Sequence, residues 1–202
     1  KGAFLSDTDT TNVTGSELVT NGTFTSNTSN WTAFNGASLS VSSNELLISY
    51  TSTNSAGAYQ DITVESGKIY VWTYNARSSS SSQIIKPTLI STDGTTIFDT
   101  GTTSVANGTL QTNDGVTIEV RSSSNHSTNQ VYSTTFKVTK NGSVRVRLIA
   151  NYNANAYFDN VSVRVAELDR SVNNNGLQVF GTVTKSAVAP GAELVAYSGF
   201  NS

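Results

Sequence analysis

The sequence predicts an all-β fold, built as a two-layer sandwich or a barrel, and two observations carry this prediction. Short runs of Thr, Val, Ile, Tyr and Phe recur along the 202 residues, separated by Asn-Gly, Asp-Gly and Ser-rich turns. No stretch has the 3.6-residue period of an amphipathic helix. Strands at this spacing, with no helices between them, are typical of sandwiches and barrels.

One strand is predicted at Ile69–Arg77, because its side chains alternate between two sides. Four residues share the side that we place in the core: Tyr70, Trp72, Tyr74 and Ala76. Asn75 and Arg77 then point outward. A tryptophan can also stack on a sugar ring, but the position of Trp72 on the core side favours a structural role.

The segments Tyr132–Thr139 and Val144–Ala150 predict a hairpin. Asn141-Gly142 between them supplies two residues that tolerate positive φ, as a type I′ turn requires. The residues expected inside are Tyr132, Thr134, Phe136, Val138, Val144, Val146, Leu148 and Ala150. Those expected outside are Lys137, Arg145 and Arg147.

Four further strands are predicted, at Glu45–Tyr50, Ala58–Val64, Ile84–Ile90 and Gly115–Arg121. Pro87 lies inside the third and makes that strand an edge or ends it early.

The chain is divided into a polar lead-in over 1–16, a sandwich over 17–165 and a β-rich C-terminal connector over 166–202. The connector has a β pattern at Leu177–Val183 and again at Glu193–Tyr197. It is too short to hold a core of its own, so we expect it to pair with the sandwich or with a neighbouring chain.

Composition limits the classes of function. Charged residues are 13% of the chain, about half the usual share, and the net charge is −2. This balance argues against binding of nucleic acid, which needs clustered Lys and Arg. No apolar run is long enough to insert in a membrane. Cysteine is absent, so neither disulfides nor thiolate metal sites form. A surface rich in Ser, Thr and Asn suits an extracellular or virion location.

Three stretches resemble parts of one protein family. They are Glu17–Phe24 followed by Trp31, Gly67–Tyr70 leading to Arg77, and the closing Tyr157–Val163. Together they resemble carbohydrate-binding modules of the family 4/9 type. The resemblance implies a jelly-roll β-sandwich, galactose-binding-like, and places Trp31 in a structural position at the sandwich edge.

The resemblance also implies a structural calcium ion. In the family, an acid follows the Phe of the front motif and another lies in the closing strand. Here the closing Asp159 is present, but Thr25 occupies the front position. Calcium takes six to eight oxygens, carboxylates included, so Thr25 and Asp159 would form a weakened site. In the alternative, Asp159 hydrogen-bonds loop amides.

A binding face is expected on the outward side of the strand that carries Asn75 and Arg77. Tyr59 and Asp61 of the preceding strand are expected to join it, with Tyr152 from a loop at its rim. Amide, guanidinium and carboxylate groups hydrogen-bond vicinal hydroxyls, and tyrosine stacks on pyranose rings. The alternative is an ordinary solvated sheet face.

Catalysis has little support in the sequence. His126 is the one histidine and lies among Ser and Asn in a predicted surface loop. Without cysteine or a second histidine, no nucleophile–histidine arrangement stands out. We therefore predict that the chain is not an enzyme.

The segments Asp169–Lys185 and Gly191–Phe200 resemble connectors in large bacteriophage virion proteins. The resulting hypothesis is a non-enzymatic virion surface module, of a tail fibre or a decoration, that adheres to host glycans and contacts other virion subunits. One alternative is a carbohydrate-binding module of a secreted glycoside hydrolase. Another is a structural filament or capsid subunit that assembles by strand addition, as a homo-oligomer.

Overall fold

The structure is a computed structural model that describes residues 15–49, 55–80, 87–99, 110–119, 127–150, 154–166, 184–187 and 195–198. Within these ranges the elements are β-strands, which confirms the predicted all-β class. In the same ranges, no helix is long and apolar enough to cross a membrane. The chain divides into two units, 1–168 and 169–202.

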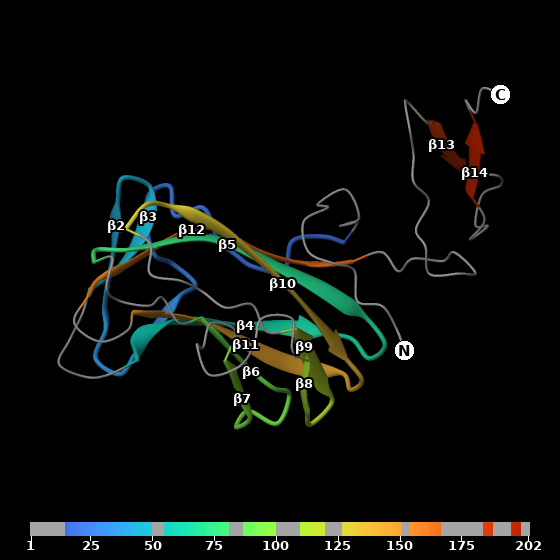
Figure 1. Ribbon diagram of the computed structural model, residues 1–202, viewed down its shortest axis with the longest axis horizontal. Coiled ribbons are helices and arrows are strands. Elements are labelled where there is room, and N and C mark those ends of the chain that lie inside the picture. The colour runs from blue at the N-terminus through green and yellow to red at the C-terminus, as the bar shows by residue number, and fades with distance from the viewer. Residues whose placement is uncertain are drawn as a thin grey trace. The chain divides into compact units, whose positions relative to one another are not determined.

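Two antiparallel sheets build the first unit. The five-stranded sheet has the order β1 (Thr32–Phe34), β4 (Ala56–Val64), β11 (Gly142–Ala150), β6 (Thr88–Ile90) and β7 (Ile97–Asp99). The seven-stranded sheet has the order β2 (Ser38–Ser42), β3 (Glu45–Ser49), β12 (Ala156–Val165), β5 (Ile69–Ser78), β10 (Gln130–Val138), β9 (Val116–Glu119) and β8 (Leu110–Asn113). In Figure 1, β4 and β11 form one layer, and β5, β10 and β12 form the other.

The chain passes repeatedly from one sheet to the other. The strands β4 and β5, β10 and β11, and β11 and β12 are consecutive but lie in different sheets. Sequence neighbours therefore close the two ends of the sandwich instead of pairing. This arrangement confirms the jelly-roll β-sandwich.

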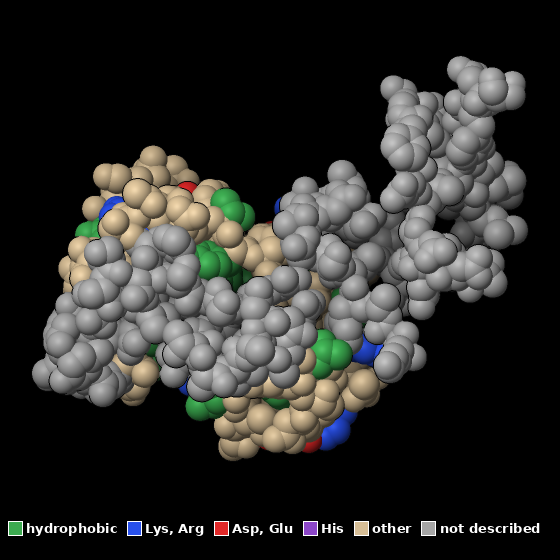
Figure 2. Space-filling model, in the orientation of Figure 1, with side chains coloured by type: hydrophobic (Ala, Val, Ile, Leu, Met, Phe, Trp, Pro, Cys, Tyr) green, Lys and Arg blue, Asp and Glu red, His purple; other side chains and the backbone are tan. Residues whose placement is uncertain are grey.

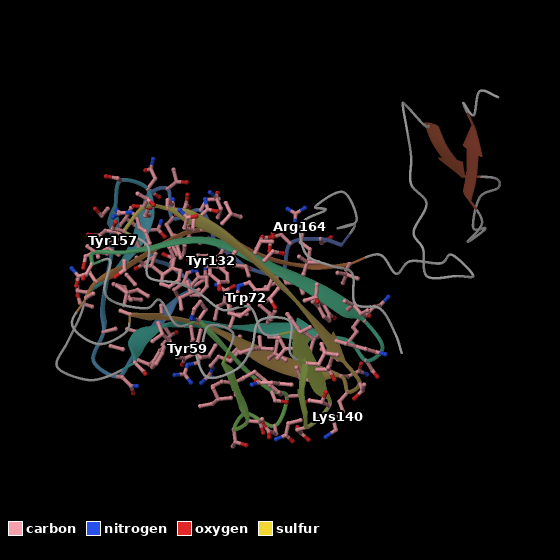
Figure 3. All side chains as sticks on the ribbon, in the orientation of Figure 1. Tyr59, Trp72, Tyr132, Lys140, Tyr157 and Arg164 are labelled. Atoms are coloured by element: carbon pink, nitrogen blue, oxygen red, sulfur yellow. The ribbon has the colours of Figure 1, made fainter. Side chains whose placement is uncertain are left out.

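The core lies between the sheets, and the predicted alternation places it correctly. Trp72 is fully buried, so its predicted structural role is confirmed. Phe136, Val138, Val144, Val146, Leu148 and Ala150 are buried as expected. Figure 3 shows Trp72 and Tyr132 between the two layers. Burial of these large side chains is the main favourable term for folding.

The front segment docks on the closing strand β12. The Glu17 carboxylate accepts hydrogen bonds from Ser162 Oγ at 2.6 Å, from Arg164 Nε at 3.0 Å and from the amides of Val19 and Val163 at 3.0 and 2.9 Å. The amide of Val161 also donates to the Gly22 carbonyl at 2.9 Å. The front stretch Glu17–Phe24 and the closing stretch Tyr157–Val163, which both carry the family resemblance, are thus joined by hydrogen bonds.

Trp31 is buried at the end of this front segment, as predicted. Its ring centroid lies 5.6 Å from that of Phe24, and its Nε1 donates to the Asn21 carbonyl at 3.1 Å. The indole thus fills apolar space and satisfies its one donor.

The predicted hairpin of β10 and β11 is wrong. β10 pairs with β5 and β9, whereas β11 pairs with β4 and β6. Neither Asn141 nor Gly142 has a positive φ, so no type I′ turn forms there. Instead the Asn141 Oδ1 accepts from the Ser66 amide at 2.7 Å, which ties this crossing to the neighbouring crossing from β4 to β5.

Type I′ turns occur at other positions. Ser43 and Asn44 have φ of 54° and 63° and join β2 to β3. Asp114 and Gly115 have φ of 38° and 80° and join β8 to β9. These are the two-residue loops whose twist suits paired strands.

The remaining predicted strands each overlap an observed one. Glu45–Tyr50 overlaps β3, Ala58–Val64 overlaps β4, Ile84–Ile90 overlaps β6 and Gly115–Arg121 overlaps β9. Residues 50, 84–86 and 120–121 of these predictions lie outside the described residues. β6 begins directly after Pro87 and lies between β11 and β7, so it is not an edge strand. Pro87 precedes the strand and removes no amide from its ladder.

The second unit contains β13 (Thr184–Ala187) and β14 (Val195–Ser198), which pair antiparallel. β14 overlaps the second predicted strand of the connector, whereas 177–183 lies outside the described residues. The lead-in over 1–16 is described only at residues 15 and 16, so it stays a prediction.

Candidate functional site

The four residues that were expected to share one binding face lie on two different sheets. Tyr59 and Asp61 belong to β4 of the five-stranded sheet, whereas Asn75 and Arg77 belong to β5 of the seven-stranded sheet. All four point away from the core, so the predicted alternation was right. The predicted juxtaposition is wrong, because the link between β4 and β5 crosses the sandwich.

On the five-stranded sheet, Tyr59 lies beside an arginine–carboxylate pair. The Arg145 guanidinium lies 3.9 Å from the centre of the Tyr59 ring. Arg145 also donates to both oxygens of Asp61, Nε to Oδ1 at 2.7 Å and Nη2 to Oδ2 at 2.9 Å. The Asp61 carboxylate raises the pKa of Arg145 above its ordinary value. A bidentate contact of this kind fixes the orientation of both side chains.

A second aromatic residue, Phe34, continues this surface. The Phe34 ring centroid lies 6.2 Å from that of Tyr59, and the Arg147 guanidinium lies 4.4 Å from the Phe34 ring centroid. Gly57 makes room for the ring, since a Cβ added there would lie 2.8 Å from Phe34 Cε1. Phe34, Tyr59, Asp61, Arg145 and Arg147 therefore form one outward surface, which we call the β4 face.

An open hollow of about 380 Å³ adjoins the β4 face. Its lining is mostly polar and consists of Leu18, Thr20, Asn30, Thr32, Tyr59, Gln60 and Asp61. Gln60 is buried and fixes the loops of this lining, because its Nε2 donates to the carbonyls of Thr20 and Asn30 at 2.9 and 3.1 Å. Its Oε1 accepts from the Thr20 amide at 2.7 Å. A buried amide with three such bonds holds the hollow open in one shape.

The seven-stranded sheet repeats the same chemistry on its outer side. The Arg77 guanidinium lies 3.6 Å from the centre of the Tyr157 ring. It also donates to Glu45, from Nη2 to Oε2 at 2.6 Å and from Nε to Oε1 at 3.2 Å. The Glu45 carboxylate raises the pKa of Arg77. In Figure 3, Tyr157 lies with the layer of β5 and β12, and Tyr59 with the layer of β4 and β11.

Asn75 lies in the middle of this second surface. Its register partners are Asp159 on β12 and Val131 on β10. Val131 is 76% exposed, which is unusual for a large apolar side chain. We call the group Glu45, Asn75, Arg77, Val131, Tyr157 and Asp159 the β5 face.

Asp159 does not hold a complete calcium cage with Thr25. Thr25 is exposed, and its hydroxyl lies 3.4 Å from that of Thr23. The Asp159 Oδ2 accepts from Asn160 Nδ2 at 3.0 Å, and burial together with the nearby Glu45 raises the pKa of Asp159. Within the described ranges no three His, Cys, Asp or Glu residues cluster as metal ligands. Calcium prefers six to eight oxygens, so these residues supply too few, and calcium stays a prediction.

Alternation in the sequence correctly predicts that Asn75, Arg77, Tyr59 and Asp61 point outward, but it does not reveal their partners. Tyr157 and Glu45 could have been found by the same alternation in their own strands. Arg145 and Arg147 were predicted outward, yet no pattern in the sequence reveals that β11 lies beside β4. Tyr152 and His126 lie outside the described residues.

Solved structures with a similar fold are carbohydrate-binding modules. The CBM22-1 xylan-binding domain of Paenibacillus barcinonensis Xyn10C has 11% sequence identity and a TM-score of 0.54, over 76% of this chain and 96% of that one. A CBM4 module has 16% identity and a TM-score of 0.50, over 72% and 98%. The CBM22-1–GH10 modules of Clostridium thermocellum xylanase 10B, complexed with xylohexaose, have 13% identity and a TM-score of 0.51, over 75% and 29%.

No family model matches the chain, and no curated protein matches it. At these sequence identities the structural likeness shows the fold alone. The sandwich therefore has the jelly-roll fold of carbohydrate-binding modules, a fold that hosts many functions, so the chemistry of the two faces decides what it can bind.

Proposed function

We propose that the sandwich is a non-catalytic glycan-binding module that uses the β4 face and the adjoining hollow. The observation that carries this proposal is the hollow itself, which is polar and has Tyr59 and Asp61 on its wall. Sugars offer both hydroxyls and apolar C–H faces, so they suit a site that combines carboxylate, amide, guanidinium and aromatic groups.

Each side chain has a role in this proposal. Tyr59 contacts the C–H face of a pyranose ring. Asp61 accepts hydrogen bonds from vicinal hydroxyls, and Arg145, held by Asp61, donates to ring or hydroxyl oxygens. Gln60 keeps the loops in place before the ligand arrives, which lowers the entropy lost on binding.

We further propose a virion surface, on a tail fibre or a decoration, as the setting of this module, with adhesion to host glycans as its role. The sparse charge visible in Figure 2 and the connector-like C-terminal segments support this setting. Many copies on one particle would multiply a weak single contact. Association with other virion subunits, or between copies of the chain, would then involve β13 and β14.

A second setting is favoured by one of the similar structures, in which the module is joined to a GH10 xylanase module. In that setting the sandwich would hold an enzyme on its polysaccharide. A catalytic domain in the same reading frame would select this alternative, and virion genes on either side would select the first.

Substitutions on the β4 face should reduce glycan binding without unfolding the sandwich. We expect Tyr59→Ala and Asp61→Asn each to weaken binding by about tenfold, since each removes one contact of about 1–1.5 kcal/mol. Affinity electrophoresis in gels that contain soluble xylan or hydroxyethylcellulose would measure this. Lys137→Ala, exposed on the other sheet, is the matched control. Equal retardation of all four proteins would contradict the proposed site.

A chelator tests the calcium prediction separately. If an ion is bound near Asp159, EDTA should lower the melting temperature, and added calcium should restore it. The Asp159→Asn variant should then lose the response to EDTA. An identical melting temperature with calcium and with EDTA would contradict the calcium prediction.

A further inference from the structure

The β5 face repeats the contacts of the β4 face on the opposite sheet. In each face, an arginine guanidinium lies within 4 Å of a tyrosine ring centre and donates hydrogen bonds to one carboxylate. The pairs are Arg145 with Asp61 and Arg77 with Glu45. The residues come from unrelated strands, so the repetition does not follow from a sequence repeat. Two surfaces with the same donors, acceptors and ring are expected to recognise the same class of ligand.

Asp159 adds a hydrogen-bond acceptor to the β5 face. Its Oδ1 is buried and has no hydrogen-bond partner among the described residues, although Oδ2 accepts from Asn160. A carboxylate oxygen without a donor is unfavourable, and rotation of the half-buried carboxylate would bring this oxygen to a ligand hydroxyl. Asn75, its register partner, adds an amide that both donates and accepts.

The charges and shape of the face restrict the ligand. Arg77 is neutralised by Glu45, and Asp159 adds no positive charge, so an anionic glycan or a nucleic acid is disfavoured. Tyr157, Asn75 and Val131 lie on three adjacent strands, β12, β5 and β10, along one side of a sheet. Such a strip suits the flat ribbon of an extended, uncharged, β-linked sugar chain, whose C–H edges cover the exposed Val131.

We propose that the β5 face is a second binding site for an extended, uncharged β-linked glycan, so that the module holds one chain on each sheet. Tyr157 stacks on a sugar ring, Asn75 and Asp159 bond hydroxyls, and Arg77 is held in place by Glu45. Two sites on opposite sheets allow one copy of the module to bridge neighbouring chains of an insoluble polysaccharide.

A titration followed by amide chemical shifts tests this proposal, with xylohexaose and cellohexaose as probes. We expect two sets of saturable shifts, one around Tyr59, Asp61 and Arg145, and one around Asn75, Arg77 and Tyr157. Tyr157→Ala should weaken the second set by at least about tenfold and leave the first intact. Asp159→Asn should also weaken the second set, because it replaces an acceptor oxygen with a donor.

Three controls separate the outcomes. Tyr59→Ala should weaken the first set alone, by about tenfold, so failure of the β4 site and failure of the β5 site give different spectra. Lys137→Ala, outward on the same sheet as Tyr157, should change neither set. Spectral dispersion of each variant reports its folding. Shifts confined to the Tyr59 set, or no shifts around Tyr157 with either probe, would overturn the second site.

Discussion

We expect Gly22→Ala to lower the free energy of unfolding by about 2–4 kcal/mol, from overpacking and a lost hydrogen bond. A Cβ at Gly22 would lie 2.0 Å from the carbonyl oxygen of Val161, which is a backbone atom and cannot turn aside. The front segment would therefore move off β12, and the bond from the Val161 amide to the Gly22 carbonyl would be lost. Chemical denaturation would measure the change.

The matched control is Gly142→Ala. A Cβ at Gly142 would meet side-chain atoms of Thr92 at 3.3 Å and would clash with no backbone atom within 3 Å. Since neither glycine has a positive φ, the two substitutions differ in space and not in backbone preference. A Gly142→Ala effect as large as that of Gly22→Ala would show that the docking of the front segment is not the cause.

Replacing Glu17 with glutamine should destabilise the sandwich by about 2 kcal/mol at neutral pH, the scale of hydrogen bonds to a charged group. The carboxylate accepts from Ser162, Arg164 and two amides, and an amide side chain keeps only part of that capacity. Thermal unfolding at pH 7 would measure the difference. Full stability of Glu17→Gln would show that shape alone joins the two segments.

The same residue predicts a pH dependence. Burial raises the pKa of Glu17, but the hydrogen bonds outweigh it and bring the pKa below its ordinary 4.5. The folded state therefore favours the charged form, and its contribution is present above about pH 4.5 and lost as the pH falls through the folded pKa. Wild type should lose stability there more steeply than Glu17→Gln. Denaturation of both proteins at each pH would measure this, and parallel stability curves between pH 6 and pH 3 would contradict this role.

The alternation of side chains was predictable from the sequence because it depends on local backbone geometry. The burial of Trp72 and the outward positions of Arg77 and Asp61 all follow from a period of two. The choice of sheet was not predictable in this way. The alternation of β10 and β11 is the same whether they form a hairpin or cross between sheets. Asn141-Gly142 wrongly predicted a type I′ turn, because the contact with Ser66 holds this segment in another conformation.

The binding faces required information that no single strand carries. Tyr59 and Arg145 are distant in sequence and meet only because β11 pairs with β4. Tyr157 and Glu45 meet Arg77 because β12 lies between β3 and β5. The hollow depends on Gln60, whose inward position in β4 looks like an interruption of the core until its bonds to Thr20 and Asn30 are seen. Part of each face was therefore predictable from the sequence, but the prediction that these parts share one face is wrong.

A glycan array tests glycan binding by the β4 face most directly when the β5 face is removed from the comparison. Tyr157→Ala and the double variant Tyr59→Ala/Tyr157→Ala would be presented multivalently on the array, each after its folding has been checked. We expect Tyr157→Ala to bind at least one class of glycan and the double variant to lose most of this signal. Folded Tyr157→Ala that binds no glycan, or a double variant that binds as Tyr157→Ala does, would contradict binding by the β4 face.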